Sequence, residues 1–237
     1  MIYFNDFNNL IVYIMNTVKQ SISTKSVKKW FIIEGNIGTG KSTFLKKLNE
    51  DLDCEIIYEP LEQWVETKDE DNKNILDHFY KDTNRWCFTF QVNALITRSM
   101  SINKSQEKKF RFVERSVFTD KHVFAENSYQ SGNMNQIEMG LYNNYFDWIQ
   151  DHFKTKPDGI IYLKADPKTS FKRIQKRSRN EESIIPLDYI EKIHERHESW
   201  LQNESNVLIL DANLEFEKNK KNFNSMIDKI KRFVQTV

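Results

Sequence analysis

The chain has 237 residues, of which 39% are hydrophobic and 13% aromatic, enough to bury the core of one α/β domain. Its formal net charge of +1 argues against a nucleic-acid-binding protein and against a polybasic membrane anchor. The two cysteines, Cys54 and Cys87, fit neither a disulfide framework nor the spacing of a zinc site, so we expect reduced thiols in an intracellular protein. No apolar run reaches the ~18 residues that a membrane-spanning helix needs.

The first 29 residues are predicted to be an N-terminal extension that precedes a single domain over residues 30–237. Residues 1–15 are rich in Ile, Phe, Tyr and Asn, and a polar stretch of Ser and Lys follows. The segment lacks the basic start of a secretory signal and the arginines that are typical of a mitochondrial presequence. We therefore expect a short packed or frayed extension, and a cytoplasmic rather than a mitochondrial protein.

A phosphate-binding pattern, G-x-x-x-x-G-K-[ST], follows a predicted strand at Trp30–Ile33 and precedes a helical pattern at Phe44–Leu48. At such a junction, glycines let backbone N–H groups surround phosphate oxygens, and the positive end of the helix dipole adds to the attraction. Lys41 can reach the terminal phosphates, and the Ser42 hydroxyl can ligate Mg²⁺. The pattern predicts a site for a nucleoside triphosphate, formed by Gly35, Asn36, Ile37, Gly38, Thr39, Gly40, Lys41, Ser42 and Thr43.

Strands and helices are predicted to alternate along the rest of the chain, which indicates an α/β fold with a five-stranded parallel sheet flanked by helices. Short runs rich in Ile, Val, Leu and Phe predict four more strands, at Cys54–Glu59, Phe110–Glu114, Gly159–Ala165 and Asn206–Asp211. Helical patterns lie between them, at Trp86–Met100, Gln136–Phe153, Lys168–Lys176 and Leu187–Gln202.

Two carboxylates stand at the ends of predicted strands, where a parallel sheet binds its ligands. Glu59 follows the second strand and Glu114 ends the third, so both are expected to face the phosphate loop. One carboxylate can accept a proton from a substrate hydroxyl, and another can hold Mg²⁺. A solvated turn residue is the alternative for each, but two such residues beside a phosphate loop favour a catalytic site.

An arginine cluster predicts a lid at about residues 173–184. Arg173 and Arg177 share one helix face because they are four residues apart, and Arg179 lies in the polar loop that follows. Such a cluster is usually a solvated face. In a phosphoryl-transfer enzyme, mobile arginines instead close over the transferring group, neutralise its charge and help to exclude water.

A polar stripe is predicted on the Trp86–Met100 helix, where Gln91, Ala94 and Arg98 fall at positions i, i+3 and i+7. An amide, a small residue and a guanidinium are unusual on a core face, but they suit the wall of a pocket for a nucleobase. Nearby aromatic candidates for stacking are Tyr80, Trp86, Phe90 and Phe124, each of which taken alone is more typical of a core.

Several motifs in this order resemble those of the deoxynucleoside kinases, in particular the deoxycytidine and deoxyguanosine kinase branch. The resemblance covers about residues 30–216. It rests on Gly35–Thr43, Glu59-Pro60, Arg85-Trp86 with Phe88-Thr89-Phe90-Gln91, Glu114-Arg115-Ser116-Val117 with Asp120, Asn180-Glu181-Glu182, Ile185-Pro186-Leu187 and His197-Glu198-Ser199-Trp200-Leu201. It departs from some members at Gly38-Thr39, where they have other small residues, and this departure changes no chemistry.

The resemblance implies a P-loop kinase fold and a role for each matching residue. Glu59 would be the general base for the 5′-hydroxyl, Arg115 would hold Glu59 and the reacting phosphate, and Ser42 and Glu114 would organise Mg²⁺. Arg173, Arg177 and Arg179 match lid arginines; Tyr80 and Glu182 match the pair that grips the 3′-hydroxyl. Gln91 would read the base edge with Phe124 stacked on the base, and Glu215 and Phe216 fall where the family holds the donor base. The family likeness further implies a homodimer, with the helices at Trp86 and Gln136–Phe153 as candidate interfaces.

We therefore predict transfer of the γ-phosphate of ATP, or of another nucleoside triphosphate, to the 5′-hydroxyl of a deoxynucleoside. Ala94, Arg98 and Asp120 match the triplet of deoxycytidine and deoxyguanosine kinases, which implies deoxyguanosine, deoxycytidine or deoxyadenosine rather than thymidine. One alternative is a nucleoside monophosphate kinase similar to thymidylate kinase, although Glu59 would repel an acceptor phosphate. The other is a non-catalytic NTP-binding regulatory protein, which would need no nucleoside pocket.

Overall fold

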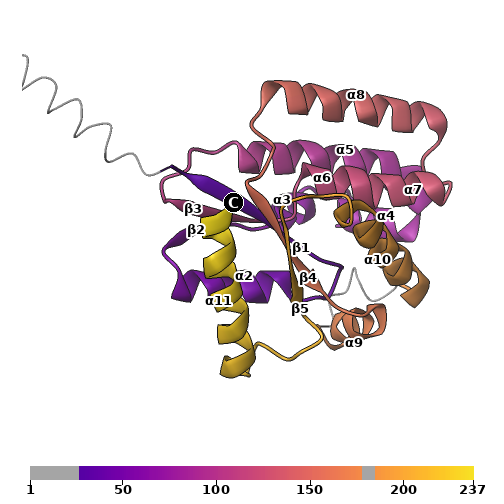
Figure 1. Ribbon diagram of the computed structural model, residues 1–237. Helices are drawn as coiled ribbons and strands as arrows, with labels where there is room; N and C mark the ends of the chain where they lie inside the picture. Colours follow the sequence, from indigo (N-terminus) through magenta and orange to yellow (C-terminus); the bar gives the residue numbers. More distant parts are fainter. Residues whose placement is uncertain (1–26, 178–184) are drawn as a thin grey trace, which may run out of the picture.

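A five-stranded parallel sheet forms the centre of the computed structural model, which describes residues 27–177 and 185–237 (Figure 1). The strand order is β2-β3-β1-β4-β5, so the prediction of a five-stranded parallel sheet is confirmed. The predicted extension lies outside the described residues as far as residue 26. The strands are β1 (Lys29–Glu34), β2 (Cys54–Ile57), β3 (Phe110–Glu114), β4 (Gly159–Lys164) and β5 (Val207–Asp211).

Strand β2 ends two residues before the predicted end at Glu59. Its last paired residue is Ile57, which lies opposite Val113 of β3. Strand β3 continues for one more residue, Glu114, which pairs with Ile33 of β1, and Arg115 then adopts a left-handed backbone conformation with φ 61°. Tyr58 and Glu59 are not paired with β3, and Glu59 lies in the loop that follows β2.

The four long helices predicted between the strands are confirmed with ends that move by at most three residues. Several helices were not predicted, namely the short α3 and α4, the run from α6 to α7, and the C-terminal α11. The helices are α2 (Lys41–Asp51), α3 (Leu61–Glu66), α4 (Ile75–Lys81), α5 (Thr83–Ile102), α6 (Val117–Thr119), the π-helical turn η1 (Asp120–Ala125), α7 (Glu126–Gln130), α8 (Gln136–His152), α9 (Pro167–Arg177), α10 (Leu187–Leu201) and α11 (Lys220–Thr236). None of the helices in the described ranges is both long and apolar enough to cross a membrane.

The central strand β1 has two buried faces, as expected of a parallel sheet covered on both sides. Phe31 and Ile33 pack with residues of α2 and α11 on one face. Ile32 packs on the other face with residues of η1 and α10. Figure 1 shows the corresponding layers, with α2 and α11 on one side of the sheet and α5, α8 and α10 on the other. The loop after β1 is thereby held at the centre of the carboxyl edge of the sheet.

Candidate active site

The phosphate loop joins β1 to α2 and has the backbone that its glycines allow. Gly38 and Gly40 have φ values of 80° and 93°, a left-handed region that residues with a Cβ rarely adopt. A Cβ on Gly40 would also lie 3.0 Å from Phe216 Cζ. The Asn36 side chain closes the loop: its Oδ1 accepts from the Ile37 N–H at 2.8 Å, and its Nδ2 donates to the Ile190 carbonyl of α10 at 2.8 Å.

The Lys41 ammonium lies inside this loop, where Nζ donates to the carbonyls of Gly35 at 3.0 Å and Asn36 at 2.8 Å. Burial and the neighbouring Arg115 lower the pKa of Lys41 to about 7, despite the opposing effect of nearby carboxylates. A triphosphate would supply the negative charge that favours the ammonium form.

The two predicted Mg²⁺ ligands are in contact: Ser42 Oγ donates to Glu114 Oε1 at 2.7 Å. A hydroxyl and a carboxylate are hard oxygen donors, and Mg²⁺ in kinases takes few protein ligands because phosphates and water complete its octahedral shell. The pair therefore fits a magnesium ion shared with a bound triphosphate.

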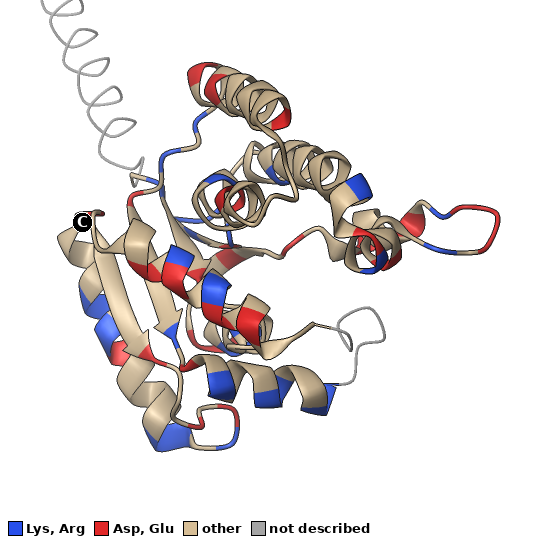
Figure 2. Ribbon diagram, turned by 90° about the vertical axis from the view of Figure 1, so that its right-hand side faces the viewer, with Lys and Arg blue, Asp and Glu red and all other residues tan. Residues whose placement is uncertain are grey.

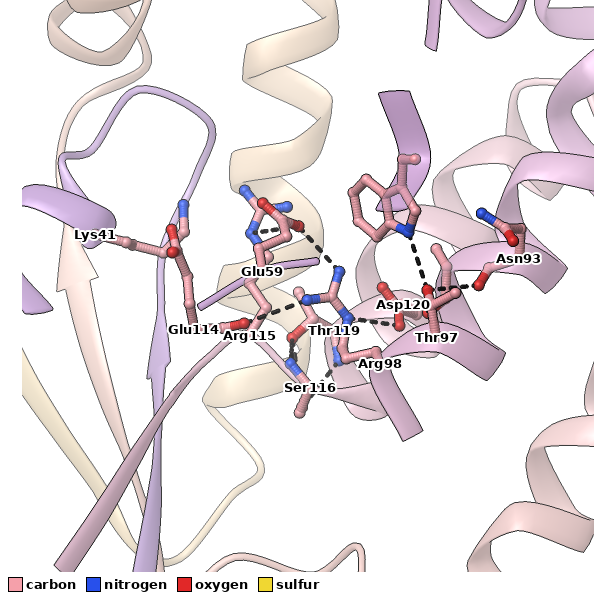
Figure 3. A network of polar contacts seen from close by, with 12 residues as sticks. Lys41, Glu59, Asn93, Thr97, Arg98, Glu114, Arg115, Ser116, Thr119 and Asp120 are labelled. Carbon is pink, nitrogen blue, oxygen red and sulfur yellow. Dashed lines mark hydrogen bonds and ion pairs between the residues drawn. The ribbon is translucent and has the colours of Figure 1, made fainter. Parts of the chain in front are cut away.

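Arg98 on α5 connects the two carboxylates on which the predicted function depends (Figure 3). Its Nη2 donates to Glu59 Oε1 at 2.9 Å, and its Nε donates to Asp120 Oδ2 at 2.8 Å. Its Nη1 donates to the Glu114 carbonyl at the end of β3, at 3.2 Å. The Arg98 side chain is only 2% exposed, so one buried cation links the predicted base with the residue predicted to recognise the nucleobase.

The Glu59 carboxylate is ionised at neutral pH. Burial alone would raise its pKa, but Arg115, Arg98 and Lys41 outweigh that effect and lower the pKa to about 2. An ionised carboxylate can accept a proton, as a general base must, and it would repel an acceptor phosphate.

Arg115 is held in a strained conformation beside Glu59. Its left-handed backbone costs on the order of 1–3 kcal/mol for a residue other than glycine, so the surrounding contacts must impose it. The guanidinium lies over the Phe124 ring, 4.6 Å from its centroid, and its Nε is 3.9 Å from Glu59 Oε1.

A cavity of about 460 Å³ extends from the phosphate loop to α5. It brings together most residues predicted to bind substrates, namely Ile37, Gly38, Gly40, Lys41, Ser42, Thr43, Glu59, Tyr80, Gln91, Ala94, Arg98, Glu114, Arg115, Asp120, Phe124 and Arg177. The Gln91 side chain is buried in the cavity wall and has no hydrogen bond to another residue of the described ranges, so its amide is available to a nucleobase.

Sequence reasoning missed several residues of this wall. Leu61, Trp64, Val65, Leu76 and Phe79 come from α3 and α4, and Tyr189 comes from α10. Trp64 donates from Nε1 to Thr97 Oγ1 at 2.9 Å, and the centroid of its ring lies 5.6 Å from the Arg98 guanidinium. Its position four residues after Glu59-Pro60 was the sequence signal that could have placed Trp64 at the site. Trp86, by contrast, does not line the cavity and stacks on His78, with ring centroids 4.6 Å apart.

The predicted lid is described only as far as Arg177. Helix α9 has several basic residues along its length, coloured blue in Figure 2, and Arg177 at its end lines the cavity. Arg173 donates from Nη1 to the Ala212 carbonyl at 2.7 Å and to the Thr39 carbonyl at 3.4 Å, so it joins the phosphate loop to the end of the sheet. Arg179 and Glu182 lie outside the described residues.

Glu215 and Phe216 lie at the start of the segment that leads into α11. The Glu215 carboxylate accepts from the N–H groups of Lys218 and Asn219, each at 2.8 Å. The Phe216 ring is 4% exposed and packs edge-on against Phe44, with ring centroids 5.6 Å apart. Phe216 thus supports the phosphate loop from the core.

A parallel sheet with this strand order, a glycine-rich loop after its central strand and a cavity above its carboxyl edge define a P-loop phosphotransferase. The profile of the family described as deoxynucleoside kinase matches residues 31–235. Similar proteins include deoxycytidine kinase of Homo sapiens, 40% identical over 86% of this chain and 90% of the relative, and deoxycytidine kinase 2 of Gallus gallus, 35% identical over 85% and 89%. Mitochondrial thymidine kinase 2 of Homo sapiens is 34% identical over 87% of this chain and 79% of the relative.

The chain therefore belongs to the deoxynucleoside kinase family. It is a phosphotransferase that acts on a nucleoside hydroxyl with a nucleoside triphosphate as donor. The alternatives of a nucleoside monophosphate kinase and of a non-catalytic regulatory protein are not supported.

Proposed function

We propose that this protein phosphorylates the 5′-hydroxyl of deoxycytidine, deoxyguanosine or deoxyadenosine in preference to thymidine, as a cytoplasmic enzyme of nucleotide salvage. The observation that carries the proposal is the buried Arg98, which binds Glu59 and Asp120 at the same time. The nucleoside would lie in the cavity beside Arg98, with its 5′-hydroxyl toward Glu59 and its base toward Asp120.

In this proposal Glu59 accepts the proton of the 5′-hydroxyl as the 5′-oxygen attacks the γ-phosphorus. The bond from that phosphorus to the bridging oxygen breaks, and the nucleoside diphosphate leaves. Lys41, Arg115 and Arg177 neutralise charge on the transferring group. Arg173 and Arg179 would act with Arg177 as the arginines of the lid. Mg²⁺, held by Ser42 and Glu114 with the donor phosphates, would supply further charge neutralisation.

Base selection follows from donor and acceptor matching. The Asp120 carboxylate can accept from the exocyclic amine of cytosine or adenine, and Arg98 can donate to a carbonyl or a ring nitrogen. Thymine would present a carbonyl to the carboxylate and its 5-methyl group to a bulky ion pair. A mismatch of buried polar groups costs about 1–3 kcal/mol, enough for strong discrimination.

The test is to measure kcat/KM with ATP and Mg²⁺ for the four deoxynucleosides, in the wild type and in Arg98→Met with Asp120→Ala. The double variant is used because Arg98→Met alone would leave Asp120 buried beside Glu59 without its cation, a change that costs about 3–5 kcal/mol. We expect the ratio of kcat/KM for thymidine to that for deoxycytidine to rise at least ~10-fold, with lower kcat for both substrates because Glu59 loses its partner. Efficient thymidine phosphorylation by the wild type would contradict the base preference.

The proposal includes a homodimer formed through α5 and α8. Helix α8 buries one face, yet its opposite face exposes four apolar side chains at helical spacing: Ile137, Leu141, Tyr145 and Trp148. Ile96 and Met100 of α5 are exposed as well. A row of exposed apolar side chains on a surface helix marks an interaction site, and α8 lies outermost in Figure 1, so a second copy of the chain is the partner that we propose.

A further inference from the structure

Glu34 is a buried carboxylate to which the mechanism above gives no role. Glu34 is the last residue of β1, is fully buried and does not line the cavity. Its Oε2 lies 3.6 Å from Nε2 of the equally buried His197 on α10. Its Oε1 accepts a hydrogen bond from the Thr119 hydroxyl.

The Thr119 hydroxyl is both a donor and an acceptor. While it donates to Glu34, its oxygen accepts from the backbone N–H of Ser116 at 2.9 Å. Because the hydroxyl proton points to Glu34 Oε1, the oxygen lone pair is left to face the Ser116 N–H. All three residues are completely buried, so water does not compete for these hydrogen bonds.

These contacts fix both peptide groups that flank Arg115. On one side the Arg115 N–H donates to the Ile33 carbonyl at 3.1 Å. On the other side the Ser116 N–H is held through Thr119 to Glu34. Two successive residues of β1 therefore hold the backbone on either side of Arg115, whose φ of 61° needs such restraint. The side chain leaves this restrained backbone toward Phe124 and Glu59.

We propose that Glu34 and Thr119 are positioning residues that place the Arg115 guanidinium for phosphoryl transfer. The inference rests on the proposed catalytic role of Arg115. It assigns to Glu34 and Thr119 an effect on turnover rather than on nucleoside binding, because a cation that stabilises transition-state charge acts on kcat. Small misplacements of such a group have large effects on rate.

The test compares Thr119→Val, which keeps the shape but lacks the hydroxyl, with Thr119→Ser, which keeps the hydroxyl. With the deoxynucleoside that the wild type uses best, we expect Thr119→Val to lower kcat ~10-fold or more and to leave the nucleoside KM within ~3-fold. Thr119→Ser should keep kcat within ~2-fold of the wild type. Equal kcat in the two variants, or a loss confined to KM, would overturn the inference.

The Arg115→Ala variant separates this inference from the function on which it rests. If Thr119 acts through Arg115, Thr119→Val should cause little further loss of kcat in an Arg115→Ala background. Full additivity of the two losses would overturn the inference and leave the role of Arg115 intact. Near-normal kcat in Arg115→Ala alone would instead remove the proposed role of Arg115, and the inference with it.

Thermal unfolding of each variant checks that the fold is retained. If Thr119→Val does not fold, Thr119→Ala takes its place against Thr119→Ser. The alanine variant should then show a kcat at least ~3-fold below that of the serine variant. Equal turnover of these two would also contradict the inference.

Discussion

The Glu59 carboxylate stands among three cations, Lys41, Arg98 and Arg115, that keep it ionised. An ionised carboxylate is suited to a general base, which must be deprotonated before the substrate binds. A low pKa also means that the carboxylate binds a proton weakly. The hydrogen bond from Arg98 fixes one carboxylate oxygen, at Oε1.

We expect Glu59→Gln to lower kcat by ~10²-fold or more while the nucleoside KM changes only a few-fold, because the amide keeps the shape and cannot accept the proton. Steady-state kinetics at saturating ATP measures both constants. Glu66→Gln is the control, since Glu66 is an exposed glutamate of α3 that does not line the cavity. Near-normal turnover of Glu59→Gln would show that another group is the base.

The pKa of Lys41 leads to a prediction about proton uptake when a nucleotide binds. With a pKa of about 7 in the free protein, Lys41 is largely neutral at pH 8. A bound nucleotide raises that pKa, so binding at pH 8 should take up close to one proton, about 0.9 for a fully recharged lysine, whereas at pH 6 the lysine is already charged. Calorimetry of ADP binding in two buffers with different ionisation enthalpies measures the uptake.

Lys41→Arg is the matched control, because arginine stays charged at both pH values. The proton uptake at pH 8 should disappear in this variant. Equal uptake in the two proteins would mean that the proton goes to a different group.

Among the elements, α8 carries the proposed dimer interface, and the prediction concerns its exposed face. Leu141→Glu with Trp148→Glu should convert a particle of twice the chain mass into one of the chain mass, because buried carboxylates without partners oppose association. Light scattering after size-exclusion chromatography measures the mass. Ile209→Glu replaces an exposed apolar residue of β5 and should leave the mass unchanged. A monomeric wild type would contradict the dimer.

The elements that sequence reasoning found are those with strong local patterns. Strands β1 and β4 contain continuous apolar runs, and α10 has a clear amphipathic period. Helices α3 and α4 have 6 and 7 residues, too few for a helical period to stand out, and with them the residues Trp64, Leu76 and Phe79 of the cavity were missed.

Helix α11 could have been predicted. Its buried residues Phe223, Ile227, Ile230 and Val234 recur at intervals of three or four, which is the spacing of one helix face. Glu34 and Thr119 could not, because the hydrogen bond that gives them a role joins residues 85 positions apart. Nothing in the local sequence of either residue indicates the other.

At the scale of the whole molecule, the cavity wall is built from α3, α4, α5, η1 and α10, so a bound nucleoside links parts of the chain that are distant in sequence. A ligand that binds only the folded state at 100 times its Kd stabilises by about 2.7 kcal/mol. For a chain of this size that corresponds to a rise in Tm of about 5–11 °C. We expect deoxycytidine to raise the Tm by about this amount and thymidine to raise it less at the same concentration.

Scanning calorimetry or a dye-based melt of the full chain measures these shifts. In Arg98→Met with Asp120→Ala, the difference between the two nucleosides should shrink, because the groups proposed to distinguish the bases are gone. A larger shift with thymidine than with deoxycytidine in the wild type would contradict the proposed preference.

The place of β1 in the middle of the sheet has a consequence for how the protein is made. Tyr162 of β4, which pairs with Glu34 at the end of β1, lies about 130 residues later in the chain. At roughly 5–20 residues per second, the ribosome adds that stretch in about 6 to 26 s, and throughout this time one edge of β1 has no partner. The sheet around the phosphate loop is incomplete until then, so we expect nascent chains to bind the donor nucleotide only after β4 has been synthesised. An apolar strand with one edge unpaired for this long is a segment that chaperones are expected to protect.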